Sequence, residues 1–387
     1  MTVPGAAAAF VRSTADVVER VNEARAQGAP LRIAGGATWL DAGRPTRAAS
    51  LLRLDGLEGI VDYTPGDLTL TARAGTTLHA IAQATAGERQ WLTLDPFGDA
   101  GATLGATVAT ASWGPLAHAF GTPRDNVLGI EAVTGDGRIV RAGGRVVKNV
   151  AGFDLTRLFT GAWGTLGVLT EITVRLRARP EAEETWALAV PDGGAALAAL
   201  LARLRTAPLA PLAVEVVAGA LARRIGAAED DVLLARLGGN ADTVAAQRDA
   251  LSALGDAAQR PSALWDALRA ADPPGASAVR LSDLPSRFAA TWNAACRAAI
   301  EAGGALVHGS PARGVARCVL APRDDGAVER FVRGALAHEG IVIFERLPTA
   351  AWSAVPAGLP NAPLAQRVKH AFDPDDLLNP GILDVEP

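Results

Sequence analysis

The density of glycine is the feature of this 387-residue chain that most restricts its fold. Between Asp95 and Glu171 the chain carries DPFGDAGATLGAT, then RDNVLG, and then GAWGTLGVLTE. Glycines among small and hydroxyl residues let a backbone press its N–H groups against an anion or a flat ring, because no Cβ holds the two apart. Each cluster alone is as compatible with a tight turn in an all-β domain. Together the clusters predict a cradle for a cofactor.

A further glycine turn lies nearer the N-terminus. Residues 31–34, LRIA, are suited to a short strand, and they run directly into GGATW at 35–39. Successive N–H groups in a turn that follows a strand can bind a phosphate. The spacing of these glycines is not that of a Rossmann fingerprint. The turn therefore predicts a phosphate site of another type.

Length and charge narrow the class of protein. A chain of this size exceeds the length at which one hydrophobic core usually keeps growing, so we expect two domains. The net charge is -4 and the isoelectric point is near 5.8, with basic residues scattered between acidic ones. This distribution offers no basic stripe for a phosphate backbone. We therefore expect no nucleic-acid partner.

The N-terminus and the cysteines exclude further classes. The alanine run near the start has no basic region before it, and it meets Arg12, Asp16 and Glu19 before reaching the length of a membrane span. We therefore expect a cytoplasmic protein without a membrane span, which would reach a membrane only through another protein. Cys296 and Cys318 cannot ligate an iron–sulfur cluster alone and lack metal-site spacing, so we predict buried thiols and no metal.

The pattern of secondary structure changes at Pro180. Before it, short alternating segments, a helix over residues 13–27 and a glycine hairpin around residue 136 are typical of a domain rich in strands. After it, strands alternate with amphipathic helices in an order that nearly repeats. That order is typical of a ferredoxin-like sheet with its helices on one face. The chain is thus predicted to have an α+β fold.

Three segments follow from this change. Residues 1–180 form the glycine-rich domain, and residues 181–345 form a ferredoxin-like α+β cap domain. Residues 346–387 form a C-terminal tail, in which two prolines and a glycine within FDPDDLLNPG force an ordered turn. We expect this tail to return to the first domain.

Residues 31–178 resemble the FAD-binding domain of the vanillyl-alcohol oxidase superfamily, which has the PCMH-type fold. The segment RVVKNVAGFDL at 145–155, followed by 161–171, looks most like the E-type FAD-binding subunits of bacterial glycolate oxidases. The tail residues FDP at 372–374 and LNPG at 378–381 also fit that family. The resemblance implies a PCMH-type FAD-binding domain with a substrate-side cap.

The resemblance also implies positions for the cofactor. The turn after residue 33 would hold the FAD pyrophosphate, a second group would line the flavin, Val168 would lie near the adenosine, and Asn379 would approach the isoalloxazine. Such a site needs small residues at its backbone contacts and apolar walls. The predicted cofactor-binding residues are Ala34, Gly35, Gly36, Ala37, Thr38, Trp39, Pro96, Gly98, Gly101, Thr103, Leu104, Gly105, Thr107, Ser112, Gly114, Gly167, Val168 and Asn379.

The chain departs from the family at three places. Relatives with covalently attached flavin have a histidine where this chain has Ala37, and alanine offers no nucleophile. We therefore expect FAD to be bound non-covalently. Ala162 and Phe153 stand where the family frequently has serine and tyrosine. Both changes remove a hydroxyl group without blocking the pocket.

Oxidation of a 2-hydroxy acid requires a cation for the carboxylate and a base for the hydroxyl proton. His308 at the end of a cap strand and Arg280 on another cap strand are the candidates, although each residue type is more often structural. Arg124 and Asp125 are better explained as a buried ion pair that shapes the cradle. The catalytic residues are otherwise not identified.

Several functions remain open at this point. The chain could be an FAD enzyme that oxidises glycolate or a similar acid to the 2-oxo acid, either within a complex or alone. It could instead be a flavin-carrying electron-transfer or assembly subunit, with the acid oxidised on a partner. A cell-wall precursor reductase shares the cradle, but no persuasive serine or glutamate proton donor supports it. The resemblance implies a second FAD subunit and an iron–sulfur subunit as partners.

Overall fold

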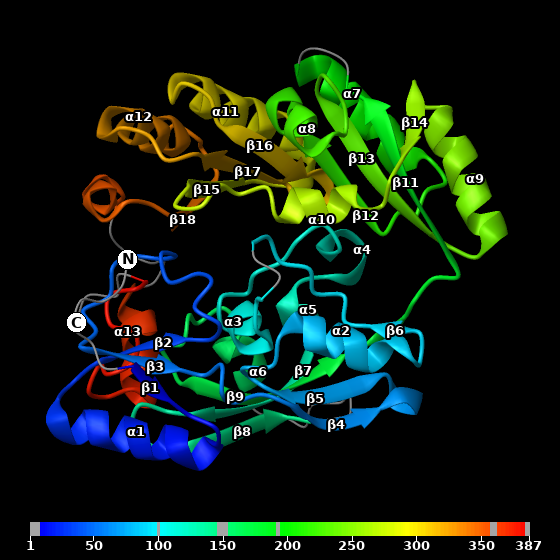
Figure 1. Ribbon diagram of the computed structural model, residues 1–387. Helices are drawn as coiled ribbons and strands as arrows, with labels where there is room; N and C mark the ends of the chain where they lie inside the picture. The colour runs from blue at the N-terminus through cyan, green and yellow to red at the C-terminus, as the bar shows by residue number, and fades with distance from the viewer. Residues whose placement is uncertain (1–7, 99–100, 145–153, 191–193, 357–361, 384–387) are drawn as a thin grey trace. The chain divides into compact units, whose positions relative to one another are not determined.

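The computed structural model describes residues 8–98, 101–144, 154–190, 194–356 and 362–383 (Figure 1). The chain divides into two compact units. Unit 1 consists of residues 1–114, 121–179 and 357–387, and unit 2 consists of residues 115–120 and 180–356. Across the described ranges, no helix combines the length and the apolar character that crossing a membrane requires.

The described residues of unit 1 form three sheets. A parallel sheet has the order β1-β3-β2, an antiparallel sheet has the order β4-β5-β9-β7-β8, and β10 pairs with β6. Its described strands are β1 (Ala8–Phe10), β2 (Leu31–Ala34), β3 (Ser50–Arg53), β4 (Ile60–Thr64), β5 (Thr69–Arg73), β6 (Gln90–Trp91), β7 (Val127–Val133), β8 (Ile139–Gly143), β9 (Val168–Arg175) and β10 (Arg177–Ala178). Its described helices are α1 (Thr14–Gln27), η1 (Pro65–Asp67), α2 (Leu78–Ala86), α3 (Leu104–Ala109), α5 (Pro123–Asn126), α6 (Leu155–Phe159) and α13 (Ala362–Phe372).

Local signals explain why α1 begins and ends where it does. Ser13 and Asp16 form a reciprocal capping box at its start, and Gly28 ends it at φ +59° in the left-handed region. Val17 and Val21 are fully buried on its inner face. The predicted helix over residues 13–27 is thus confirmed. The buried face packs into a core shared with β2, β3 and Leu378 of the tail.

Unit 2 is built on one eight-stranded antiparallel sheet with the order β14-β11-β13-β12-β16-β17-β15-β18. Its described strands are β11 (Ala182–Ala189), β12 (Ala213–Val217), β13 (Val232–Gly239), β14 (Ala257–Arg260), β15 (Ser277–Ser282), β16 (Leu306–Ser310), β17 (Val315–Leu320) and β18 (Ile341–Arg346). Its described helices are α4 (Ala117–Phe120), α7 (Gly194–Thr206), α8 (Gly219–Ile225), α9 (Ala241–Ser252), α10 (Leu264–Arg269), η2 (Pro285–Arg287), α11 (Phe288–Glu301), η3 (Pro311–Arg313), α12 (Asp325–Leu336) and η4 (Thr349–Ala354).

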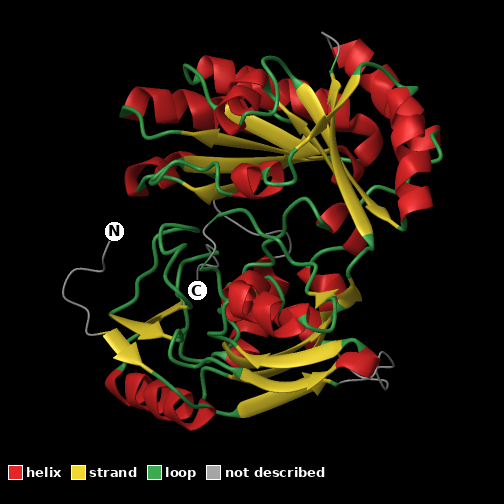
Figure 2. Cartoon of the chain, turned by 45° about the vertical axis from the view of Figure 1, so that its right-hand side comes forward, coloured by secondary structure: helices red, strands yellow, loops and turns green. Residues whose placement is uncertain are grey.

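This sheet consists of two ferredoxin-like halves. The first half has the order β11, α7, β12, β13, α9 and β14, with α8 inserted between β12 and β13. The second half repeats this order as β15, α11, β16, β17, α12 and β18, with the short helices η2 and η3 inserted. The halves join edge to edge through β12 and β16, with the pairs Val216–Gly309 and Val217–His308. The long helices cover one face of the sheet over an apolar core (Figure 2). The predicted α+β class and its near-repeat are confirmed.

The compact units differ from the predicted domain limits in two places. Residues 346–356, predicted as tail, belong to unit 2 because β18 continues to Arg346 and Trp352 is buried in the core of the cap. Residues 115–120 also belong to unit 2, although the sequence predicts them in the first domain. One contact that joins them to unit 2 is a hydrogen bond from the guanidinium of Arg313 to the carbonyl of Ala117. The distance from Arg313 Nε to Ala117 O is 2.9 Å.

Candidate functional site

The turn that leaves β2 presents open backbone donors. Asn379 accepts from Ile33 N–H, and β3 pairs with the other side of β2, but Gly35, Gly36, Ala37 and Thr38 donate no backbone hydrogen bond to any described residue. Gly35, Gly36 and Ala37 are partly buried and Thr38 is exposed, so these N–H groups are accessible to a ligand. A run of successive open amides is suited to binding an anion.

Arg32 supplies a cation to the same place. Its side chain is 7% exposed and lines the cavity, and its guanidinium donates only to the carbonyls of Leu40 and Ala42 among the described residues. No described carboxylate forms an ion pair with it. Burial lowers the pKa of Arg32 to about 10, so it remains charged at neutral pH. A buried guanidinium that has carbonyl partners but no carboxylate is suited to an anionic ligand.

The cavity beside this turn has a volume of about 90 Å³. That space is too small for a whole dinucleotide and suits one section of it, such as a pyrophosphate. The open amides and the unpaired Arg32 therefore fit the phosphate groups of FAD. The described residues that line the cavity are Arg32, Ile33, Ala34, Gly35, Gly36, Ala37, Thr38, Trp39, Leu40, Leu54, Gly105, Ala106, Ala109, Thr110, Trp163, Gly164, Gly167, Leu169, Asn379 and Ile382.

Half of the predicted cofactor-binding residues meet at this cavity: Ala34 to Trp39, Gly105, Gly167 and Asn379. The others lie outside its lining, and their contact with FAD stays a prediction. These others are Pro96, Gly98, Gly101, Thr103, Leu104, Thr107, Ser112, Gly114 and Val168. The lining residues that sequence reasoning misses include Arg32, Thr110 and Trp163. Helical spacing from Gly105 through Ala106 and Ala109 could have indicated one face of α3.

Several predicted glycines owe their identity to packing within the chain. The N–H of Gly105 donates to Ala74 O at 2.8 Å, so it is not an open donor. A Cβ on Gly105 would lie 2.7 Å from Ala74 Cβ, and one on Gly98 would lie 2.8 Å from Trp39 Nε1. Gly35 similarly faces the side chain of Thr103, the N-cap of α3. These glycines let the segments of the cradle approach one another.

Other predicted positions are occupied by structural contacts. Ser112 shares a hydrogen bond of 2.7 Å with Thr110, and Gly114 faces the backbone of Asp95. The side chain of Val168 is fully buried in the core beneath α1. Thr107 donates to the carbonyl of Thr103. The segment RVVKNVAGF at 145–153, which carries part of the resemblance, lies outside the described residues.

The turn after α6 carries unusual backbone conformations for a non-glycine residue. Trp163 lies at φ +54° and Gly164 at φ +69°, and Ala37 in the phosphate turn lies at φ +61°. Left-handed conformations cost alanine and tryptophan free energy, and they cluster at functional sites. The cradle therefore combines open donors with backbone strain.

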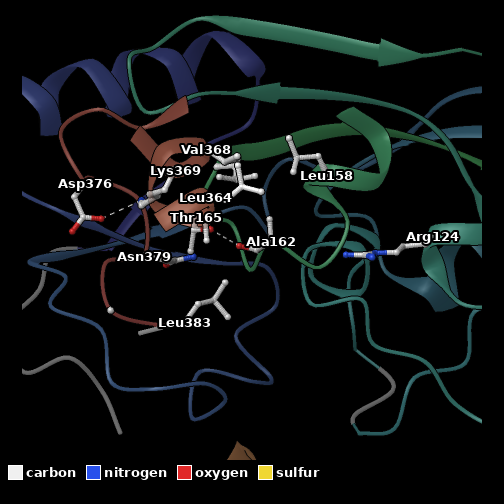
Figure 3. Close-up of a pocket in the computed structure, with 13 residues that line it drawn as sticks. Arg124, Leu158, Ala162, Thr165, Leu364, Val368, Lys369, Asp376, Asn379 and Leu383 are labelled. Carbon is white, nitrogen blue, oxygen red and sulfur yellow. Dashed lines mark hydrogen bonds and ion pairs between the residues drawn. The ribbon is translucent and has the colours of Figure 1, made fainter. Parts of the chain in front are cut away.

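A second cavity of about 390 Å³ lies beside the tail in the same unit (Figure 3). Leu158, Leu364 and Val368 give it apolar walls, and Arg124, Lys369 and Asp376 add charges. Lys369 forms ion pairs with Asp373 and Asp376, so its charge is already balanced. The predicted pair of Arg124 with Asp125 is not found in the described structure; Arg124 instead donates to Thr160 O, and Asp125 caps α5 at Thr122.

The two catalytic candidates both lie in unit 2 and both have carboxylate partners. His308 Nδ1 lies 3.1 Å from Glu215 Oε2, and the two side chains are 4% and 1% exposed. Burial raises the pKa of Glu215, and His308 opposes that rise. Arg280 Nε lies 2.7 Å from Glu345 Oε1. These contacts leave a catalytic role for either residue a prediction.

Arg280 belongs to a buried network of ion pairs, because Glu345 pairs with both Arg280 and Arg317. Arg317 donates from two nitrogens to Asp272, at 2.8 and 2.7 Å, and from Nε to Glu345 at 2.8 Å. Arg346 also pairs with Asp272. Burial alone would raise the pKa of Asp272, but the two arginines outweigh it and lower that pKa to about 2. The cap thus balances its buried charges internally.

The described part of the chain shows neither a reactive thiol nor a metal site. Cys318 is buried and Cys296 is partly buried, and both are free thiols. Burial raises the pKa of Cys296 to about 12, so this thiol is not a nucleophile at neutral pH. Among the described residues, no group of three or more histidine, cysteine, aspartate or glutamate side chains could hold a metal ion.

Comparison with known proteins decides the family. Residues 5–143 match the FAD binding domain family. The chain is 30% identical to the glycolate oxidase subunit GlcE of Escherichia coli K12, across 96% of this chain and 97% of the relative. The chain belongs to the GlcE family of glycolate oxidase subunits. FAD is the cofactor of this family domain, and the predicted recognition and cofactor are confirmed.

Other matches are partial in sequence or restricted to the fold. Glycolate oxidase subunit GlcD of Bacillus subtilis is 35% identical over 141 residues, which cover 36% of this chain and 30% of that protein. The solved structure of p-cresol methylhydroxylase with substrate bound has a TM-score of 0.79 at 14% identity, covering 98% of this GlcE-family chain and 88% of that chain. At that identity the likeness shows the fold alone, which is the predicted PCMH type.

Proposed function

We propose that this chain is the FAD-binding subunit of a glycolate oxidase complex that oxidises glycolate, a 2-hydroxy acid, to glyoxylate. The observation that carries the proposal is the open phosphate turn beside the unpaired Arg32, in a chain similar to GlcE over nearly its whole length. Bound FAD supplies an acceptor for two electrons and a proton from the hydroxyl-bearing carbon. The protein supplies binding and orientation.

The residues of unit 1 have defined tasks in this proposal. The amides of residues 35–38 and the guanidinium of Arg32 bind the pyrophosphate, because charge-assisted hydrogen bonds to phosphate are the strong ones. Ala37 offers no nucleophile for a covalent bond to the flavin. FAD should therefore leave with the supernatant when the yellow protein is precipitated with acid. Flavin that stays with the precipitate would identify another attachment residue.

The partners follow from counting redox centres. A reduced flavin must pass on two electrons, and the two cysteines of this chain cannot ligate an iron–sulfur cluster. We propose a second FAD subunit and an iron–sulfur subunit as the route for those electrons. The similarity to both GlcE and GlcD supports a complex with several subunits.

A second candidate function is a flavin-carrying electron-transfer or assembly subunit, with the acid oxidised on the partner flavin. It is favoured by one observation: the candidates for base and carboxylate clamp, His308 and Arg280, both contact buried carboxylates. Arg280 would have to release Glu345 before it could bind a substrate carboxylate. The isolated chain would then bind FAD but turn over no glycolate.

The test is glycolate-dependent reduction of an artificial dye by the chain alone, by the co-expressed complex, and by the complex without this chain. Activity of the complex that requires this chain supports the first proposal. An isolated chain that binds FAD without turnover favours the second candidate within the complex. A chain that turns over glycolate alone at the rate of the complex would instead be a stand-alone dehydrogenase, and His308 and Arg280 would be the first residues to substitute.

A further inference from the structure

The tail runs alongside β2 and ends in a residue with an unusual conformation. Leu31 and Leu378 form a parallel bridge, and Asn379 N–H donates to Leu31 O at 2.9 Å. Asn379 lies at φ +47° and is 3% exposed. Asparagine tolerates the left-handed region better than most residues other than glycine. The backbone thus places this side chain against the start of the phosphate turn.

The carboxamide of Asn379 joins two segments that lie far apart in the sequence. Its Oδ1 accepts from Ile33 N–H at 2.8 Å, and its Nδ2 donates to Trp163 O at 2.7 Å. Ile33 precedes the open amides, and Trp163 belongs to the strained turn on the other side of the cradle. A Cβ on Gly164 would lie 2.9 Å from Asn379 Nδ2, which shows how closely the turn approaches. Both ends of the carboxamide therefore bind protein.

Asn379 lines the two cavities of unit 1 described above. In Figure 3 it lies with Thr165 and Ala162 at the wall of the larger cavity. Trp163, Gly164 and Gly167 line the smaller one. Asn379 is therefore part of the wall of each of these two cavities.

The segment that carries Asn379 is itself held rigidly. Asp373 is 1% exposed, and its two oxygens accept from Leu377 N–H at 3.0 Å and Leu378 N–H at 2.8 Å. Lys369 pairs with the same carboxylate and donates to Leu378 O at 3.0 Å. These contacts fix the tail immediately before Asn379. The carboxamide consequently holds the turns that it joins at a set separation.

We propose that Asn379 is a positioning residue that sets the width of the phosphate site by joining Ile33 to Trp163, and that it does not contact the isoalloxazine ring. This role differs from the one that the resemblance implies. The inference rests on the proposed FAD site. Its effect is on how tightly the cofactor is held, and the electronic properties of the flavin stay unchanged.

The test is to measure FAD binding and the visible absorption spectrum of bound flavin in two variants. Asn379→Gly accepts the positive φ without strain and removes both hydrogen bonds, so the dissociation constant should rise by about 10- to 100-fold. Asn379→Asp keeps an acceptor for Ile33 and loses the donor to Trp163, so it should also bind FAD more weakly. In both variants the bands of bound FAD should keep their positions. Asn379→Asp also serves as the second variant if Asn379→Gly does not fold.

A matched control is Asn240→Gly, which removes the asparagine that caps α9 in unit 2 through a 2.8 Å bond to Thr243 N–H. It should leave FAD affinity unchanged. Wild-type affinity in Asn379→Gly would overturn the assignment, and so would shifted flavin bands in Asn379→Asp, because a carboxylate placed against the ring would shift them. A wild-type chain that binds no FAD would overturn the proposed function itself, whereas the other two results overturn this inference alone.

Discussion

The two units differ in how their polar groups are paired. In unit 2, Arg317 lies between Asp272 and Glu345, and each charge in the network has a partner. In unit 1, the amides of residues 35–38 and the guanidinium of Arg32 find no such partner among the described residues. A polar group is normally buried only when it is paired. The comparison indicates that the polar groups without a partner in unit 1 mark the ligand site. The fully paired charges of unit 2 instead stabilise its fold.

Breaking the closed network should have the largest effect on stability. Arg317→Met leaves Asp272 and Glu345 buried without their shared cation, and such a loss typically costs about 3–5 kcal/mol. Urea unfolding followed by circular dichroism would measure it. FAD content should stay at the wild-type ratio under conditions where the variant is folded. Loss of FAD from the folded variant would show that the network serves the cofactor.

Breaking the cradle should affect the cofactor as well as stability. In Gly105→Val the new side chain meets Ala74, whose carbonyl also accepts the N–H of residue 105. The two residues cannot separate to make room for the side chain without breaking this hydrogen bond. Overpacking of this kind costs about 1–3 kcal/mol. We expect the purified variant to retain no FAD, measured as the ratio of flavin to protein absorbance.

Gly87→Val is the matched control for this variant, because a Cβ on Gly87 meets nothing within 4 Å and its φ is -59°. That variant should remain yellow. Full occupancy of FAD in Gly105→Val would mean that α3 does not form a wall of the site.

Removing the open cation should separate binding from folding. Arg32→Met deletes a buried charge whose partners among the described residues are two carbonyls, at 3.3 and 3.5 Å, so apoprotein stability should change by less than about 1 kcal/mol. FAD affinity should fall by about 10- to 100-fold, because one charge-assisted phosphate contact is lost. Isothermal titration with FAD would measure it, and Arg32→Lys should restore part of the affinity. Unchanged affinity would remove Arg32 from the phosphate site.

The smallest expected effect concerns backbone strain in the phosphate turn. Ala37→Gly relieves a left-handed alanine, worth about 1–2 kcal/mol, and is opposed by about 0.4–1 kcal/mol of added entropy in the unfolded chain. We expect a gain in stability of at most about 1.6 kcal/mol in a thermal melt, with FAD still bound. A decrease in stability would show that the methyl group makes a packing contact that outweighs the strain.

Sequence reasoning predicts best where a local signal decides the structure. The cap of α1 at Ser13 and its end at Gly28 are readable because both depend on neighbours within a few residues. It misses β14, with the sequence AAQR, because that strand has no apolar alternation and forms only by pairing with β11. It also misses the joining of two ferredoxin-like halves, since this depends on two residue pairs between β12 and β16.

The same limit applies to the candidate site. Glycines mark the cradle in the sequence, but the sequence does not say whether the missing Cβ makes room for a ligand or for Ala74. Arg32 is one arginine among many until its lack of a carboxylate is visible in three dimensions. Asn379 is predicted as a cofactor-binding residue, but its hydrogen bonds to Ile33 and Trp163 are not predicted, because both partners lie far away in the sequence. Hydrogen bonds and ion pairs between residues far apart in the sequence cannot be predicted from the sequence alone.

The order of the chain has a consequence for how the protein is made. Unit 1 is interrupted, because residues 180–356 belong to unit 2 and lie between β9 and the tail. Domains generally fold as units as they emerge during synthesis. The cap is therefore synthesised before Asp373 and Asn379, the residues that join the tail to the cradle. The phosphate site of unit 1 can be completed only after the whole of unit 2 has been made.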